Sequence, residues 1–246
     1  RPRHVATRLR AAARRAGAAI LDIYANEADF QVEHKADTSP LTIADRTANT
    51  IICSALEALP VQYPIISEEN KLQPYTERQH FSKAWLVDPL DGTFNFSRRM
   101  PLCCVSVGLW DGMTPVLGVI YDFSTDVCYS GIVGTGAWRN GTPIHVSPIT
   151  DPSKAALCTG FPAGGDFGRD SLMGLVKQIQ HYKKVRMVGS AALALAFVAA
   201  GYVDAYQEDD IHFWDVAGGI AVIVAAGGRF RMQPGTRTWQ FEVVAD

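Results

Sequence analysis

The sequence has little that would place the protein in a membrane or on nucleic acid. Its net charge is only −2, with 23 Lys and Arg against 25 Asp and Glu in 246 residues, so no overall basic field attracts a phosphate backbone. The two longest apolar stretches, near residues 191–200 and 216–228, are too short to span a bilayer and are interpreted as buried helices. We therefore expect neither a membrane partner nor a nucleic-acid partner.

Cysteine is scarce, and its spacing indicates no cross-link. The five cysteines are an odd number, and they form neither a CxxC pair nor a zinc-ligand pattern. No signal-peptide pattern is visible either. These absences predict reduced, mostly buried thiols in a cytoplasmic protein.

The start of the chain departs from the balanced charge. Six arginines precede the first acidic residue, Asp22, which raises the alternatives of a transit peptide and a basic arm. The alanine-rich run continues smoothly into Gly17 to Leu21, as it would in one amphipathic helix. We therefore predict an opening helix.

Apolar periodicity and turn residues divide the chain into two parts. Before residue 147, helices are predicted at 5–25 and 42–59, strands at 64–67 and 84–87, a polar loop at 70–83 and an antiparallel meander at 102–147. A hinge is predicted near 148–152. After it, helices at 169–181, 190–200 and 215–226 alternate with strands near 185–188 and 203–206. The pattern predicts a two-lobed α+β protein, with an N-terminal antiparallel lobe (1–147) and a C-terminal mixed α/β lobe (148–246).

The segment from Trp85 to Phe96, WLVDPLDGTFNF, carries the strongest chemical signal. Pro89 keeps Asp88 out of helical geometry, so the preceding strand is predicted to stop there. Asp88 and Asp91 would then project into the same space. The amides of Gly92 and Thr93 would lie at a helix start, which is a natural phosphate site.

Two carboxylates beside an anion site would repel a phosphate unless cations lie between them. Hard oxygen ligands favour magnesium, so we hypothesise that metal ions bridge the carboxylates and the phosphate. An isolated DxxDG motif is more often an ordinary turn. Asp215, at the start of an apolar helix, and Glu68, at the end of a strand, are also ordinary when taken singly. The hypothesis depends on all of these acids together.

Together these motifs resemble the inositol monophosphatase family, part of the lithium-sensitive, magnesium-dependent phosphatase superfamily. The likeness covers nearly the whole chain. The matching segments are Asp88 to Phe96 (DPLDGTFNF), Trp214 to Gly219 (WDVAGG), Ala226 to Gly228 (AGG), Lys35 to Asp45 (KADTSPLTIAD) and Ser67 to Glu69 (SEE). The resemblance implies a layered α/β/α/β/α sandwich like that of this family and of fructose-1,6-bisphosphatase.

The resemblance also implies two or three Mg²⁺ ions in each site. It assigns the first ion to Glu68, Asp88 and the backbone carbonyl of Leu90. It assigns a second ion to Asp88, Asp91 and Asp215, with Glu68 also near a third, weaker ion.

By the same resemblance, Glu68 and Thr93 would orient the attacking water, and Asp45 would be hydrogen-bonded to the Thr93 hydroxyl. Phosphate would contact the metals and the amides of Gly92 and Thr93. Substrate would be bound by Ser190, Ala191 and Glu208, together with Asp91 and Asp215.

The substrate remains open between related monoesters. Inositol monophosphate is the first expectation, since Glu208 stands at the substrate position. The alternatives are a 3′(2′),5′-bisphosphate nucleotide and histidinol phosphate, because the Lys35 to Asp45 block resembles those branches more. A non-catalytic binding or regulatory protein that retains the fold is a further alternative. The resemblance also implies a homodimer and inhibition by lithium.

Overall fold

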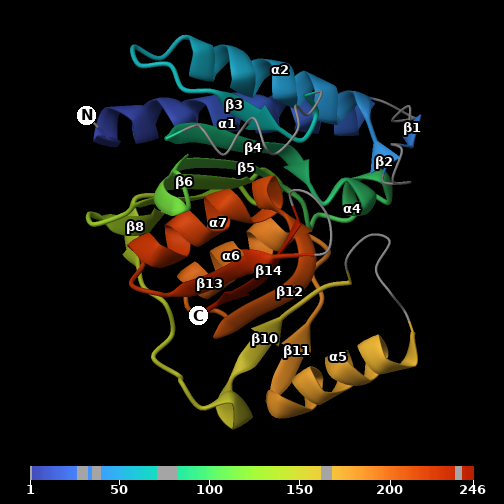
Figure 1. The fold of residues 1–246 in the computed structure, drawn as a ribbon. Coiled ribbons are helices and arrows are strands. Elements are labelled where there is room, and N and C mark those ends of the chain that lie inside the picture. The colour runs from blue at the N-terminus through green and yellow to red at the C-terminus, as the bar shows by residue number, and fades with distance from the viewer. Residues whose placement is uncertain (1, 27–32, 35–39, 71–81, 162–167, 236–239) are drawn as a thin grey trace.

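The computed structural model describes residues 2–26, 33–34, 40–70, 82–161, 168–235 and 240–246. Residues 35–39 of the Lys35 to Asp45 block and residues 71–81 of the predicted 70–83 loop lie outside these ranges. Two larger sheets and their covering helices account for most of the fold (Figure 1). No helix in the described ranges has both the length and the apolar character that crossing a bilayer requires.

The larger sheet has seven strands that follow one another in chain order. Only β3 and β4 are parallel, and every later neighbour is antiparallel, because short turns such as Asp111–Gly112 and Asn140–Gly141 join them. The predicted meander is thus confirmed. Its strands are β3 (Ile65–Ser67), β4 (Lys83–Asp91), β5 (Cys104–Asp111), β6 (Thr114–Asp122), β7 (Val127–Ile132), β8 (Gly136–Arg139) and β9 (Thr142–Ile144).

Two helices, α1 (Pro2–Asn26) and α2 (Ile43–Glu57), cover one face of this sheet. Small side chains along α1 let its backbone lie close to the strands and form one core cluster with α2. Helix α2 begins with a capping box, in which the Thr42 side chain accepts from the Ala44 amide and Asp45 accepts from the Thr42 amide. This cap holds Asp45 in place.

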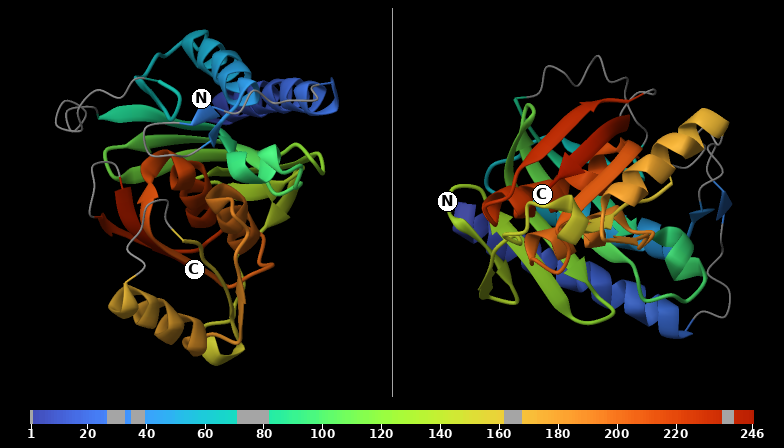
Figure 2. Two further views of the ribbon diagram at one scale, coloured as in Figure 1. Left: turned by 90° about the vertical axis from the view of Figure 1, so that its right-hand side faces the viewer. Right: turned by 90° about the horizontal axis from the view of Figure 1, so that it is seen from below.

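The second sheet has five strands in the order β11-β10-β12-β14-β13 and mixes parallel with antiparallel pairs. Helices α6 (Ala191–Ala199) and α7 (Phe213–Ala225) lie between the two sheets, and α5 (Arg169–His181) lies beyond the second sheet (Figures 1 and 2). Its strands are β10 (Ala156–Cys158), β11 (Lys184–Arg186), β12 (Ala205–His212), β13 (Phe230–Pro234) and β14 (Gln240–Ala245). The predicted α/β/α/β/α layering is confirmed.

The smaller elements are a two-stranded sheet of β1 (Glu33–His34) and β2 (Pro40–Leu41), the short helix α4 (Thr93–Ser97) and the 3-10 turn η1 (Pro152–Lys154). The pairing of β1 with β2 was not predicted from the sequence. The two-stranded sheet lies beside α4 at one end of the molecule (Figure 1).

A row of glycines seats α7 on the seven-stranded sheet. Gly108, Gly118 and Gly131 are direct cross-strand neighbours on β5, β6 and β7. A Cβ added at Gly118 would stand 2.1 Å from the carbonyl oxygen of Gly218, so backbone meets backbone there. This close approach fixes where the first turn of α7, with Asp215, lies relative to the sheet.

Two sequence-based boundaries were wrong. The strand predicted to stop at Asp88 continues to Asp91, because a bulge accommodates Pro89, which has no N–H to donate to the ladder. The strand predicted at 203–206 runs from Ala205 to His212, because β14 pairs with it beyond Tyr206. Both segments are polar or interrupted by proline, and only the partner strand reveals that the pairing continues.

Candidate active site

Three carboxylates from distant parts of the chain converge at one end of the seven-stranded sheet. Glu68 directly follows β3, Asp88 lies in β4, and Asp215 lies in the first turn of α7. One carboxylate oxygen of each lies within 4.8 Å of the others. Asp88 is buried, whereas Glu68 and Asp215 remain partly accessible to solvent. This set of hard oxygen ligands fits a divalent cation such as Mg²⁺.

The bulge in β4 explains how Asp91 joins the cluster. In a regular strand, residues three apart point to opposite faces of the sheet. Here Asp88 pairs with Ser106 and Asp91 pairs with Cys104, so β4 carries one more residue than β5 across this interval. The extra residue restores the facing, and Asp91 comes close enough for the charge of Asp215 to raise its pKa.

Electrostatics indicates that the cluster favours a cation. Burial, followed by the charges of Glu68, Asp91 and Asp215, raises the pKa of Asp88 well above its ordinary value. Burial and Asp215 raise the pKa of Asp91 to about 8, against the lowering effect of its hydrogen bonds. Without a counter-charge these carboxylates are held close to one another at a cost in free energy. A bound divalent cation would remove that cost.

Hydrogen bonds orient Asp91. Its Oδ2 accepts from the Ser190 hydroxyl at 2.6 Å and from the Ala192 amide at 2.7 Å. Ser190 also caps α6, since its Oγ accepts from the Leu193 amide. The start of α6 therefore positions a carboxylate of the seven-stranded sheet, which ties the two halves of the site together.

Thr93 and Asp45 form a second polar group beside the cluster. The Thr93 hydroxyl lies 2.9 Å from Asp45 Oδ1 and 2.9 Å from the carbonyl oxygen of Leu90. Its single proton serves one acceptor at a time, while its lone pairs remain available. Asp45 is fixed through Oδ2 by the amide and hydroxyl of Thr42, and burial raises the pKa of Asp45 to about 6.

Gly92 makes the turn from β4 into α4. Its φ of 89° is left-handed, and a Cβ there would stand 2.7 Å from the Leu102 carbonyl oxygen, so a side chain would be excluded. The turn brings the amides of Gly92 and Thr93 to the start of α4 beside Asp88 and Asp91. Whether they bind phosphate stays a prediction.

A pocket of about 210 Å³ opens beside the carboxylates. It is lined by all four predicted substrate-contact residues of the C-terminal half. Glu208 Oε2 accepts from the Tyr206 hydroxyl at 2.9 Å, and burial raises the pKa of Glu208 to about 7. The residues relevant here are Asp91, Ser190, Ala191, Tyr206, Glu208 and Asp215.

Sequence reasoning missed two residues of this region. Tyr206 lies two positions before Glu208 on β12, and this period-2 spacing was the available signal. Asn95 donates through Nδ2 to the carbonyl oxygens of Leu102, Val188 and Gly189, so it ties α4 to the pocket loop. No sequence signal links Asn95 to a loop that lies more than ninety positions away.

Comparisons with known proteins show which family the chain resembles over nearly its whole length. A model described as "Inositol monophosphatase family" matches residues 2–242. "Inositol monophosphatase 3" of Solanum lycopersicum is 36% identical over 200 residues, which cover 80% of this chain and 75% of that protein. "Inositol monophosphatase 1" of Rattus norvegicus is 30% identical over 223 residues, which cover 88% of this chain and 79% of that protein.

Solved structures show the same fold. An inositol monophosphatase from Anabaena matches with a TM-score of 0.81 and 30% identity, covering 99% of this chain and 89% of that one. The extragenic suppressor protein suhB from Bartonella henselae matches with a TM-score of 0.84 and 29% identity, covering 98% of this chain and 93% of that one.

Proposed function

The chain belongs to the inositol monophosphatase family, and we infer from this that it is a phosphomonoesterase that hydrolyses inositol monophosphate. The observation that carries the inference is the convergence of Glu68, Asp88 and Asp215 beside the pocket that contains Glu208. The sequence motifs, the fold and this geometry agree.

We propose that the carboxylates hold Mg²⁺. Glu68, Asp88 and the Leu90 carbonyl would hold one ion. Asp88, Asp91 and Asp215 would hold another, and Glu68 would also contact a third. When bound, the ions supply positive charge for the phosphate oxygens and lower the pKa of a coordinated water. The raised pKa values of Asp88 and Asp91 support this assignment, because nearby cations would relieve the repulsion between them.

The neighbouring residues would orient the reacting groups. Thr93, whose proton Asp45 can accept, would present a lone pair to the attacking water, and Glu68 would accept a proton from that water. The amides of Gly92 and Thr93 would donate to the phosphate. No covalent enzyme intermediate is required.

Substrate choice is assigned to the pocket. The Glu208 carboxylate, with one oxygen held by Tyr206, has its other oxygen available to accept from a hydroxyl of a polyol phosphate. Ser190 and Ala191 would line the same space. The curated relatives described above are inositol monophosphatases, which favours inositol monophosphate over a bisphosphate nucleotide or histidinol phosphate.

The family membership supports three further proposals. We propose that lithium inhibits the enzyme, that the chain forms a homodimer, and that it acts in the cytoplasm. Size-exclusion chromatography with light scattering tests the dimer, and a lithium titration at fixed Mg²⁺ tests the inhibition.

The decisive experiment measures phosphate release from inositol 1-phosphate, a 3′,5′-bisphosphate nucleotide and histidinol phosphate side by side, with Mg²⁺ and with EDTA. Inositol 1-phosphate should be hydrolysed fastest, and only with Mg²⁺. Asp88→Asn should abolish release. The control Asp151→Asn removes a carboxylate whose side-chain contacts among the described residues are to nearby Ser153 and Lys154, and it should retain activity. Full activity of Asp88→Asn, or no hydrolysis of any monoester, would refute the proposal.

A further inference from the structure

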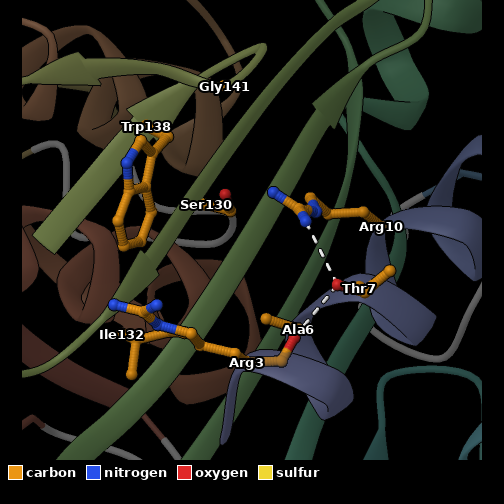
Figure 3. A pocket seen from close by; sticks show the side chains of 8 residues that line it. All are labelled: Arg3, Ala6, Thr7, Arg10, Ser130, Ile132, Trp138 and Gly141. Atoms are coloured by element: carbon orange, nitrogen blue, oxygen red, sulfur yellow. Dashed lines mark hydrogen bonds between the residues drawn. The ribbon is translucent and has the colours of Figure 1, made fainter. Parts of the chain in front are cut away.

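A second pocket lies on the opposite face of the seven-stranded sheet from α7 (Figure 3). Its floor is formed by Ser130 and Ile132 of β7 and Trp138 of β8, and one wall is formed by the first turns of α1. The glycine row and the carboxylate cluster, which includes Asp215 of α7, lie on the other face of this sheet. The volume, about 450 Å³, suits a small organic molecule. Its lining residues are Arg3, Ala6, Thr7, Arg10, Ser130, Ile132, Trp138 and Gly141.

The polar groups of this pocket are mainly donors. Arg3 and Arg10 line it from α1, and Figure 3 shows their guanidinium groups reaching towards Trp138 and Ser130. The described lining residues include no carboxylate. Neither arginine forms an ion pair with any described residue, although Arg14 on the same helix pairs with Asp126. Two positive charges thus face the same space without a negative partner.

Ser130 adds a neutral hydroxyl to the floor of this pocket. Ser130 is only 3% exposed as a whole residue. Its side chain lines the pocket and has no hydrogen-bond partner within the described ranges. The pocket leaves this hydroxyl accessible, so it can donate to or accept from a bound molecule. Thr7, by contrast, is already engaged, because its hydroxyl donates to the Arg3 carbonyl at 3.0 Å and accepts from Arg10 at 3.2 Å. Ser130 therefore offers a free polar group aimed at whatever fills the pocket.

Trp138 adds an apolar surface. The indole ring is partly buried against the core on the α1 side, and Ile132 lies on the same floor. A planar apolar group can pack against this floor while an acidic group meets the guanidinium donors, which bind carboxylate and phosphate oxygens in pairs. We propose that this pocket binds a small organic anion with a flat apolar body, such as an aryl carboxylate or an aryl phosphonate, at a site separate from the catalytic one.

Calorimetric titration tests the site on the whole protein in EDTA, where the metal-free catalytic carboxylates repel anions. The probes are phenylphosphonate and benzoate, with benzyl alcohol as the neutral analogue. We expect saturable binding of at least one anion with a Kd below about 10 mM, and none of the alcohol. Arg10→Gln and Arg3→Gln should each weaken binding by about tenfold, the effect of losing a hydrogen bond to a charged group.

Two further variants separate a built site from general attraction or misfolding. Arg15→Gln removes the same charge from an exposed position of α1 outside the pocket and should leave binding unchanged. Ser130→Ala removes only the unpartnered hydroxyl, so it should keep the melting temperature and weaken anion binding a few-fold. Equal weakening by Arg15→Gln, equal binding of benzyl alcohol, unchanged binding by both Arg10→Gln and Ser130→Ala, or no saturable binding would each overturn the proposal.

Discussion

The close packing of α7 against Gly118 of β6 predicts how much a larger side chain there would destabilise the protein. In Gly118→Ala, the new Cβ would stand 2.1 Å from the Gly218 carbonyl oxygen and 3.0 Å from Ala221 Cβ. The first distance is roughly 1 Å shorter than a normal van der Waals contact. The new Cβ is attached to the backbone of β6 and the oxygen belongs to the backbone of α7, so a change of side-chain rotamer cannot relieve the clash. Helix α7 must therefore move away from the sheet by about 1 Å.

Overpacking of this kind costs about 3 kcal/mol, the upper end of the usual range, because the backbone cannot relax locally. In a protein of this size the cost corresponds to a fall in melting temperature of roughly 6–12 °C. Asp215 lies in the first turn of α7 and would move with the helix. With Mg²⁺ as the proposed ion, which binds poorly to displaced ligands, we expect the Mg²⁺ concentration for half-maximal activity to rise about tenfold.

Differential scanning fluorimetry and a Mg²⁺ titration of phosphate release measure the two effects. The matched control is Gly174→Ala on exposed helix α5, where an added Cβ meets nothing within 4 Å. It should keep the Mg²⁺ requirement and stabilise slightly, because alanine favours helix over glycine. A Gly118→Ala protein with an unchanged melting temperature and an unchanged Mg²⁺ requirement would refute the argument that the glycine row positions Asp215.

Three other predictions follow from the site. The folded pKa of Asp91 is raised to about 8 from 3.8, so the folded metal-free protein binds more protons than the unfolded chain between these values. Its melting temperature in EDTA should therefore fall as pH rises from 5 to 8, and Asp91→Asn should flatten this fall; a fall of the same size in Asp91→Asn would contradict it. Thr93→Val should lower kcat about a hundredfold with little change in melting temperature, whereas Thr93→Ser should restore most activity, since the hydroxyl proton that reaches Asp45 is the group at issue. Glu208→Gln should raise the KM for inositol 1-phosphate several-fold at an unchanged Mg²⁺ requirement, and a changed requirement would place Glu208 among the metal ligands instead.

The β4 segment shows which features of the site can be predicted from neighbouring residues in the sequence. Asp88 and Asp91 were predicted to share one space, and the pKa of each is raised by their neighbours. The reason given was wrong, because the strand does not stop at Asp88. Pairing continues through a one-residue bulge, and that bulge turns both carboxylates the same way. A bulge is defined by the pairing of β4 with its partner strand β5. Pro89 is compatible with a bulge, but Pro89 alone does not predict one.

The pocket on the α1 side of the sheet could not be predicted from the sequence. The sequence predicts that Arg3 and Arg10 belong to one amphipathic helix, and α1 confirms that helix. Nothing in the pattern shows that Arg3 and Arg10 face Ser130 and Trp138, because the contact joins segments more than a hundred residues apart. The packing of α1 on β7 and β8 created that juxtaposition.

The sequence by itself determined the family, the element types and the acidic motifs, because hydrophobic periodicity, turn residues and the DPLDGT and WDVAGG segments are local features of the chain. Only the tertiary structure decided how Glu68, Asp88 and Asp215 meet within 4.8 Å. Their distance depends on strand register, on the β4 bulge and on the backbone contact between Gly118 and Gly218. Each of these relations joins different segments of the chain, and the pairing and packing of those segments set it.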